Sequence, residues 1–365
     1  MNFIYSDKGE MIMSSSVEKS SSGVQSLLTA QSLVYAGIAW GVVSLLFFLL
    51  FSITVPGEKS PLWYLVGTYI LELVPFLVAA IFCFRNWRSP QIASGRNVWL
   101  GIGLGTICWF VGGLLFGWWE LYLNLEPDVS PADLFYILFY LFVSWGMVLA
   151  VLPRRLNLEI WQWVTVAAIA LAGIALATWV FISTPETAKE ASTSIPPSAI
   201  EQQATKTTDL FSATVEPKAI LVQASPTSSP TTAQPPVSKP APEENPEKEP
   251  PSWAISLEKI LKPLGKYVNL FYIVGDVFLL VIASTLLLAF WGGRFAQSWR
   301  MIAAAAFSLY ISDMWFKYAE ATFAEYESGG LLEVFFVFSG VLFAIGAVLE
   351  YDVSSRSRRG GRRRA

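Results

Sequence analysis

The chain has no histidine, only two cysteines, and few charged residues for its length. Of its 365 residues, 15% are Asp, Glu, Lys or Arg, whereas soluble domains carry about 25%. Cys83 and Cys108 both lie inside apolar segments, which argues against a secreted disulfide framework. Without histidine, and with isolated cysteines, the usual ligand sets of haem, zinc and iron–sulfur clusters are missing. We therefore expect no cofactor and no metal.

Apolar residues are correspondingly abundant. They make up 54% of the chain, and the mean hydropathy is +0.49. Apolar runs long enough to cross about 30 Å of hydrocarbon lie near 34–55, 62–84, 98–119, 133–152, 160–182, 268–290, 301–318 and 331–350. The sequence therefore predicts an all-α integral membrane protein with eight transmembrane helices, multi-pass in the plasma membrane. Trp63, Trp99, Trp118, Trp119, Trp161, Trp163 and Trp299 lie near the ends of these runs, as interfacial anchors do.

The arginines predict the orientation. If the N-terminus is cytoplasmic, every arginine falls in a cytoplasmic loop or in the C-terminal tail, as the Lys/Arg bias of short cytoplasmic loops requires. The loop arginines are Arg85, Arg88, Arg96, Arg154, Arg155, Arg294 and Arg300. Both termini are therefore predicted to be cytoplasmic.

Polar stretches divide the chain into parts. We expect a cytoplasmic segment over 1–32, a first four-helix unit over 33–156, a fifth span over 157–183, and an amphipathic segment with spans six to eight over 253–351. The interval 184–252 holds thirteen of the 21 prolines, and its composition predicts a disordered extracytoplasmic linker. Apolar residues at helical spacing after Trp253 predict a short helix on the outer membrane surface.

The tail over 352–365 is rich in arginine and is expected to be a flexible cytoplasmic arm. Such a charge run suits contact with anionic lipids, or with an acidic signalling protein in the cytoplasm; a nucleic acid is not expected. The residues concerned are Arg356, Arg358, Arg359, Arg362, Arg363 and Arg364.

Residues near 133–149 recur two hundred positions later. Asp133 matches Glu333, Gly146 matches Gly346, and Glu120 matches Glu320. The stretch Tyr64-Leu65-Val66-Gly67, at the start of the second span, also resembles Tyr272-Ile273-Val274-Gly275 at the start of the sixth. These matches predict two tandem four-helix units, which an even number of helices per unit would place in the same orientation.

Ionisable groups within the spans are the candidate functional residues, because charges in hydrocarbon usually face a bundle interior or cavity. They are Glu72, Asp133, Asp276, Asp313, Lys317 and Glu333. Glu72 lies about 17 Å into its span at the rise of an α-helix, near mid-membrane. Asp133, Asp276 and Glu333 are placed in first helical turns, where an acid also serves as a cap, and Lys317 lies one turn from Asp313, as an ion pair requires. Together these acids suggest a vestibule open to the outer side, with Glu72 at its floor.

Three stretches resemble a known prokaryotic membrane region. Residues 127–140, 274–280 and 311–333 are similar to the P-x-x-S-x-A-D-x-x-Y-x-x-x-Y, G-D-x-x-L-L and closing motifs of a multi-helix region commonly N-terminal to histidine kinase, diguanylate cyclase or phosphodiesterase modules. This chain has Glu333 where that family has Asp, and we expect it to act without an output module of its own. The resemblance implies a prokaryotic inner-membrane sensor that acts through a separate partner.

Three classes of function follow from these observations. The first is a non-enzymatic sensor or signalling module. The second is a transporter of a small solute or ion that uses the membrane carboxylates, and the third is an envelope-associated assembly protein. No nucleophile–base pair is evident, so no catalytic residue is predicted.

Overall fold

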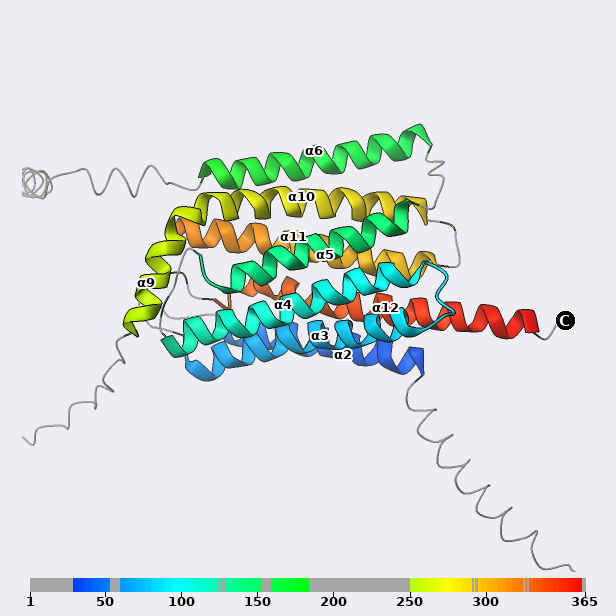
Figure 1. Cartoon of the computed structure of the whole chain (residues 1–365), viewed down its shortest axis with the longest axis horizontal. Helices are drawn as coiled ribbons and strands as arrows, with labels where there is room; N and C mark the ends of the chain where they lie inside the picture. The colour runs from blue at the N-terminus through cyan, green and yellow to red at the C-terminus, as the bar shows by residue number, and fades with distance from the viewer. Residues whose placement is uncertain are drawn as a thin grey trace, which may run out of the picture. The chain divides into compact units, whose positions relative to one another are not determined.

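The computed structural model describes residues 29–52, 60–123, 125, 129–152, 159–183, 250–290, 292, 295–323, 326 and 328–362. This part of the chain is helical and has no strand, which confirms the predicted all-α class (Figure 1). Its elements are α2 (Ala30–Phe51), α3 (Leu62–Arg88), α4 (Arg96–Leu123), α5 (Ala132–Val151), α6 (Ile160–Ser183), α9 (Ser252–Leu261), η1 (Lys262–Leu264), α10 (Gly265–Ala289), α11 (Ala296–Thr322), η2 (Leu331–Glu333) and α12 (Val334–Arg362). The predicted N-terminal segment and the proline-rich linker fall almost wholly outside the described residues.

Seven helical segments in the described residues are long and apolar enough to cross a membrane: α2 to α6, the α9–α10 stretch, and η2–α12. The chain is therefore a multi-pass membrane protein by length and composition. A helix also forms over the predicted seventh span, but this helix, α11, is not among the seven. It carries Arg300, Asp313, Lys317 and Glu320, which lower its hydropathy.

Six helices form a closed ring. Going around it, α3 packs on α4, α4 on α5, α5 on α10, α10 on α11, α11 on α12, and α12 back on α3. Outside the ring, α2 lies against α12 and α3, and α6 lies against α10 and α11. The ring brings spans that are far apart in the sequence around one interior.

Glycines let α4 approach its neighbours closely. A Cβ atom at Gly101 would lie 2.7 Å from the Cα atom of Gly146 on α5, and one at Gly105 would lie 2.4 Å from Val143. On another face, a Cβ atom at Gly113 would lie 2.3 Å from Leu73 on α3. Small residues serve this purpose at membrane helix pairs, where backbone approach increases van der Waals contact.

The short helix α9 forms where the amphipathic segment was predicted, and Figure 1 shows it turned away from the direction of α10. The 3-10 turn η1, which contains Pro263, separates the two helices. Ala254 of α9 is buried against Trp119 and Leu123 at the end of α4, and Trp253 stacks on Trp118 with ring centroids 6.1 Å apart.

Two tryptophans predicted as interfacial anchors lie instead in the core at the opposite end of the ring. Trp99 and Trp299 are both 0% exposed, and their ring centroids are 6.2 Å apart. Phe290 stacks on Trp299 at 5.0 Å. Trp119 is also buried, whereas Trp63, Trp161 and Trp163 are about half exposed. Nearness to a span end therefore did not separate anchors from core residues.

The helix α12 continues beyond the predicted end of the last span. It runs to Arg362, so most of the stretch expected to be a flexible arm is helical, and Figure 1 shows this helix reaching past the ends of its neighbours. Arg356 pairs with Asp352 one turn earlier, Nε to Oδ2 2.9 Å, a spacing that supports an exposed helix. Arg363 and Arg364 lie outside the described residues.

Candidate functional site

A cavity of about 140 Å³ lies between the ring helices. It lies toward the end of the ring at which α4 and α11 end and α5 and α12 begin. Five carboxyl side chains line it: Glu72, Asp133, Asp313, Glu320 and Glu333. Nine aromatic side chains complete most of the wall: Phe48, Tyr69, Trp109, Phe116, Tyr136, Tyr140, Tyr272, Phe316 and Phe336. Since a water needs roughly 10–15 Å³ of such space, the cavity has room for several waters or one small solute.

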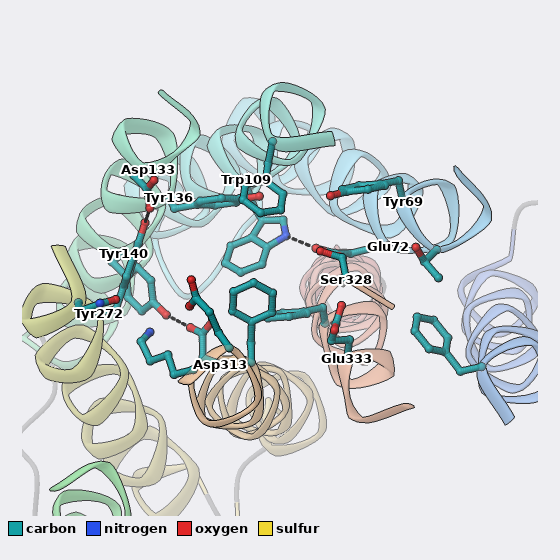
Figure 2. A pocket seen from close by; sticks show the side chains of 18 residues that line it. Tyr69, Glu72, Trp109, Asp133, Tyr136, Tyr140, Tyr272, Asp313, Ser328 and Glu333 are labelled. Atoms are coloured by element: carbon teal, nitrogen blue, oxygen red, sulfur yellow. Dashed lines mark hydrogen bonds between the residues drawn. The ribbon is translucent and has the colours of Figure 1, made fainter. Parts of the chain in front are cut away.

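The structure brings five of the six candidate residues together at this cavity, namely Glu72, Asp133, Asp313, Lys317 and Glu333. Figure 2 shows the labelled acids arriving from different helices around a largely aromatic interior. The sixth candidate, Asp276, does not line the cavity. It accepts a hydrogen bond from the hydroxyl of Tyr140, which does line the cavity.

Glu72 is the eleventh residue of α3, as the sequence predicted, and it reaches the cavity from there. The Trp109 indole donates a hydrogen bond to Glu72 Oε1 at 2.9 Å. Within the described part of the chain, no hydrogen bond reaches Glu72 Oε2. Trp109 itself stacks on Phe76 with ring centroids 5.0 Å apart, so the indole that orients this carboxylate is held in place.

Asp133 acts both as a cap and as a link between helices. Its Oδ2 accepts the backbone N–H of Ser130 at 2.7 Å, at the start of α5. Its Oδ1 accepts the hydroxyl of Tyr272 on α10 at 2.6 Å. The predicted capping role is present, and a tyrosine that the sequence interpretation did not assign joins it to the neighbouring helix.

Glu333 is enclosed by the turn that precedes α12. Its carboxylate accepts the backbone N–H groups of Gly329 and Gly330, both at 2.9 Å, and the hydroxyl of Tyr326. Gly329 has φ +108°, a conformation that favours glycine, and its carbonyl accepts the Tyr64 hydroxyl at 2.5 Å. Burial and the adjacent Glu333 carboxylate raise the pKa of Tyr326 far above its ordinary value, so the phenol remains a donor to this carboxylate.

Asp276 is not in a first helical turn, which corrects the sequence interpretation. The helix α10 already begins at Gly265, so Asp276 is its twelfth residue, and it is 1% exposed. The Tyr140 hydroxyl bridges Asp276 and Asp313 by hydrogen bonds. Because a phenol has one proton to donate, both contacts form together only when one of the carboxyl groups supplies a second proton.

The predicted ion pair of Asp313 with Lys317 does not form. The Lys317 ammonium lies over the ring of Tyr272, 4.5 Å from its centroid, and Asp313 is bonded to Tyr140 instead. Both partners come from other helices, α10 and α5. The helical spacing was read correctly, but it carried no information about those neighbours.

The sequence interpretation missed the aromatic partners of the acids. A hydrogen bond to a candidate acid is donated by Tyr140 to Asp276, by Tyr272 to Asp133 and by Trp109 to Glu72. Tyr69 donates to Glu120. The signal that could have found one of them is the spacing of Asp133, Tyr136 and Tyr140, which places both tyrosines on the same face of α5 as the acid.

At the opposite end of the ring the interior is filled. The Ser298 hydroxyl donates to the Gly346 carbonyl at 2.8 Å, and the Asn86 amide donates to the Ala347 carbonyl at 2.8 Å. Together with Trp99 and Trp299 these contacts join α3, α11 and α12 where the arginine-bearing helix ends lie. No cavity residue comes from this end.

No protein-family model matches the chain, and neither a curated protein nor a solved structure matches it.

Proposed function

We propose that the chain is a non-enzymatic receptor of the plasma membrane. In this proposal eight helices cross the membrane with both termini in the cytoplasm. The cavity binds a small solute from the outer side, and the signal passes to a separate cytoplasmic protein.

Two features of α11 support its role as the eighth crossing. It is 27 residues long, and it packs within the ring between α10 and α12. Its charged residues Asp313 and Lys317 line the cavity, where they escape contact with lipid, so a low hydropathy does not count against a crossing. Eight crossings also put Arg85, Arg96 and Arg300 on one side, in agreement with the cytoplasmic bias of arginine.

Equivalent packing supports two tandem units. A Cβ atom at Gly146 would meet the Val98 carbonyl at 2.8 Å and the Ile102 side chain at 3.2 Å. A Cβ atom at Gly346 would meet the Ser298 carbonyl at 3.3 Å and the Ile302 side chain at 2.7 Å. Each contact recurs two hundred positions on, and the ring itself consists of two consecutive sets of three helices, α3 to α5 and α10 to α12.

The observation that carries the receptor proposal is the one-sided cavity. The lining residues come from all six ring helices but only toward one end of them. Toward the other end the interior of the ring holds buried side chains such as Trp99, Trp299 and Phe343. A site closed by packed core on one side suits binding and signalling. The helical extension of α12 to Arg362 offers a surface at the closed end for an acidic partner or anionic lipid.

Transport is the second candidate, and one contact favours it. The Tyr140 hydroxyl links acids on α10 and α11 across the ring, and shared protons between membrane-embedded acids are used in proton relays. Movement of a proton there could accompany movement of a solute.

One experiment separates the two candidates. The full chain is reconstituted into sealed vesicles, and association of labelled small solutes is measured with and without a proton or sodium gradient. A receptor binds at most one solute per chain and is unaffected by either gradient. Accumulation far beyond one solute per chain, abolished by dissipating a gradient, would refute the receptor and establish a transporter.

A further inference from the structure

We infer that the solute bound in this cavity is a small organic cation with an ammonium head group. This inference rests on the proposed function and names the chemical class of ligand that the same site takes. Four observations carry it: the balance of charge, the aromatic wall, the position of a lysine of the protein itself, and a buried carboxylate oxygen without a partner.

The charge balance of the wall is strongly one-sided. Five carboxyl groups and a single ammonium, that of Lys317, line the cavity. Two of the acids are already used structurally, because Asp133 and Glu333 accept backbone N–H groups at helix starts. Glu72 is different, since the Trp109 indole donates to one of its oxygens and no hydrogen bond reaches the other in the described part of the chain. Asp313 accepts the Tyr140 hydroxyl, and it lines the cavity with Glu72. These two acids are the counter-ions that we assign to a ligand cation.

The remaining wall suits an organic ammonium. The Trp109 ring lies 4.9 Å from the Tyr136 ring and 5.4 Å from the Phe336 ring, centroid to centroid, beside the carboxylate of Glu72. The face of an aromatic ring attracts a cation, and tryptophan does so most strongly. Such rings also bury the alkyl groups of an organic cation, for which a bare metal ion has no use. In the described residues, moreover, no three acids converge as metal ligands would.

Lys317 shows that the cavity accepts this chemistry. Its ammonium lies 4.5 Å from the centroid of the Tyr272 ring, and it forms no ion pair with an acid among the residues that the structure describes. The hydroxyl of that tyrosine donates to Asp133, so the ring stands between an anion and a cation. A ligand ammonium over the rings beside Glu72 would reproduce the arrangement.

Asp276 supplies the fourth observation. Its side chain is 1% exposed, and its Oδ2 atom has no hydrogen-bond partner within the described residues. A buried carboxylate oxygen without a partner is costly. Asp313 and Lys317 both act on Asp276 electrostatically, so an additional cation near Asp313 would offset the repulsion between the two acids.

The test uses the full chain in lipid nanodiscs and three probes: butylammonium, choline and phenethylammonium. Each is compared with an uncharged analogue of the same shape, such as dimethylbutanol for choline, by equilibrium dialysis. We expect at least one ammonium probe to bind saturably, about tenfold or more tighter than its uncharged analogue. Equal binding of both members of every pair, or no binding of any ammonium probe, would overturn the inference.

Variants locate the site. Glu72→Gln removes a charge but keeps an acceptor for Trp109, and we expect it to weaken ammonium binding about tenfold or more and to leave binding of the uncharged analogue unchanged. Glu159→Gln, at an exposed acid before α6, is the matched control and should bind as the parent does. Asp313→Asn provides a second test if the first variant does not fold. Unaltered ammonium affinity in both cavity variants would refute the site.

The two proposals fail in different ways. Uptake far above one solute per chain would refute the receptor and leave the preference for cations intact. Saturable binding with equal affinity for charged and uncharged probes would refute the preference and leave the receptor intact.

Discussion

Replacing Gly101 by alanine tests the close approach of α4 and α5. The added Cβ atom would lie 2.7 Å from Gly146 Cα, 2.8 Å from Gly146 N and 2.9 Å from the Phe142 carbonyl oxygen. All three are backbone atoms, so no side-chain rotation relieves the overlap. Ordinary contact begins at 3.4 Å, so the two helices must separate by at least about 0.7 Å (3.4 − 2.7).

The magnitude follows from two opposing effects. Inserting a methyl group into a packed interface costs about 1–3 kcal/mol, and rigid backbone on the other side puts Gly101→Ala at the upper end. The better helix propensity of alanine returns at most about 1 kcal/mol. We therefore expect a net loss of about 2 kcal/mol in the free energy of unfolding. Gly41→Ala is the matched control, because its Cβ atom would lie 3.6 Å from Phe338, and it should be neutral or stabilising by up to about 1 kcal/mol.

The assay is equilibrium unfolding of the two variants and the parent in detergent micelles, followed by helix content and tryptophan fluorescence. The expected gap between the variants is about 2–3 kcal/mol. If Gly101→Ala unfolds together with Gly41→Ala, the close α4–α5 contact described above is incorrect.

Two further predictions concern the cavity and the orientation. Tyr272→Phe removes the hydrogen bond to the Asp133 carboxylate and should lower the free energy of unfolding by about 1.5–3 kcal/mol. Tyr267→Phe, at a residue 72% exposed, is the control and should leave the unfolding midpoint unchanged. Equal midpoints for the two variants would contradict the link between α5 and α10. The orientation is tested in a chain without its natural cysteines. Lys259→Cys should react with a membrane-impermeant maleimide on intact cells, whereas Arg356→Cys should react only after lysis. The reverse pattern would invert the proposed topology.

The helices could be predicted from the sequence because hydropathy is a local property. The predicted span starting at 62 begins where α3 begins. Hydropathy did not reveal how the short helix α9 joins the apolar helix α10. A predicted span start at 268 placed Asp276 within the first turns of its helix, whereas α10 follows η1 directly and begins at Gly265.

The candidate acids could be predicted as a set, but their partners could not. Burial of a charge in hydrocarbon is costly for any helix arrangement, so Glu72 and Asp313 stand out in the sequence. Which hydroxyl or indole satisfies each acid depends on the order of helices around the ring. Tyr140 and Asp313 are 173 positions apart, and no local pattern relates them.

The proposed duplication relates the charged residues that α11 contributes to the cavity to uncharged positions of α4. At the offset of two hundred residues, Gly113 and Gly117 of α4 correspond to Asp313 and Lys317 of α11. The glycines let α4 close against α3, where added Cβ atoms would meet Leu73 at 2.3 Å and Tyr69 at 3.2 Å. The acid and the lysine instead line the cavity from α11. Two units that pack alike at their buried glycines thus differ in what α4 and α11 contribute to the cavity, and such a difference is the divergence expected of duplicated copies that share one site.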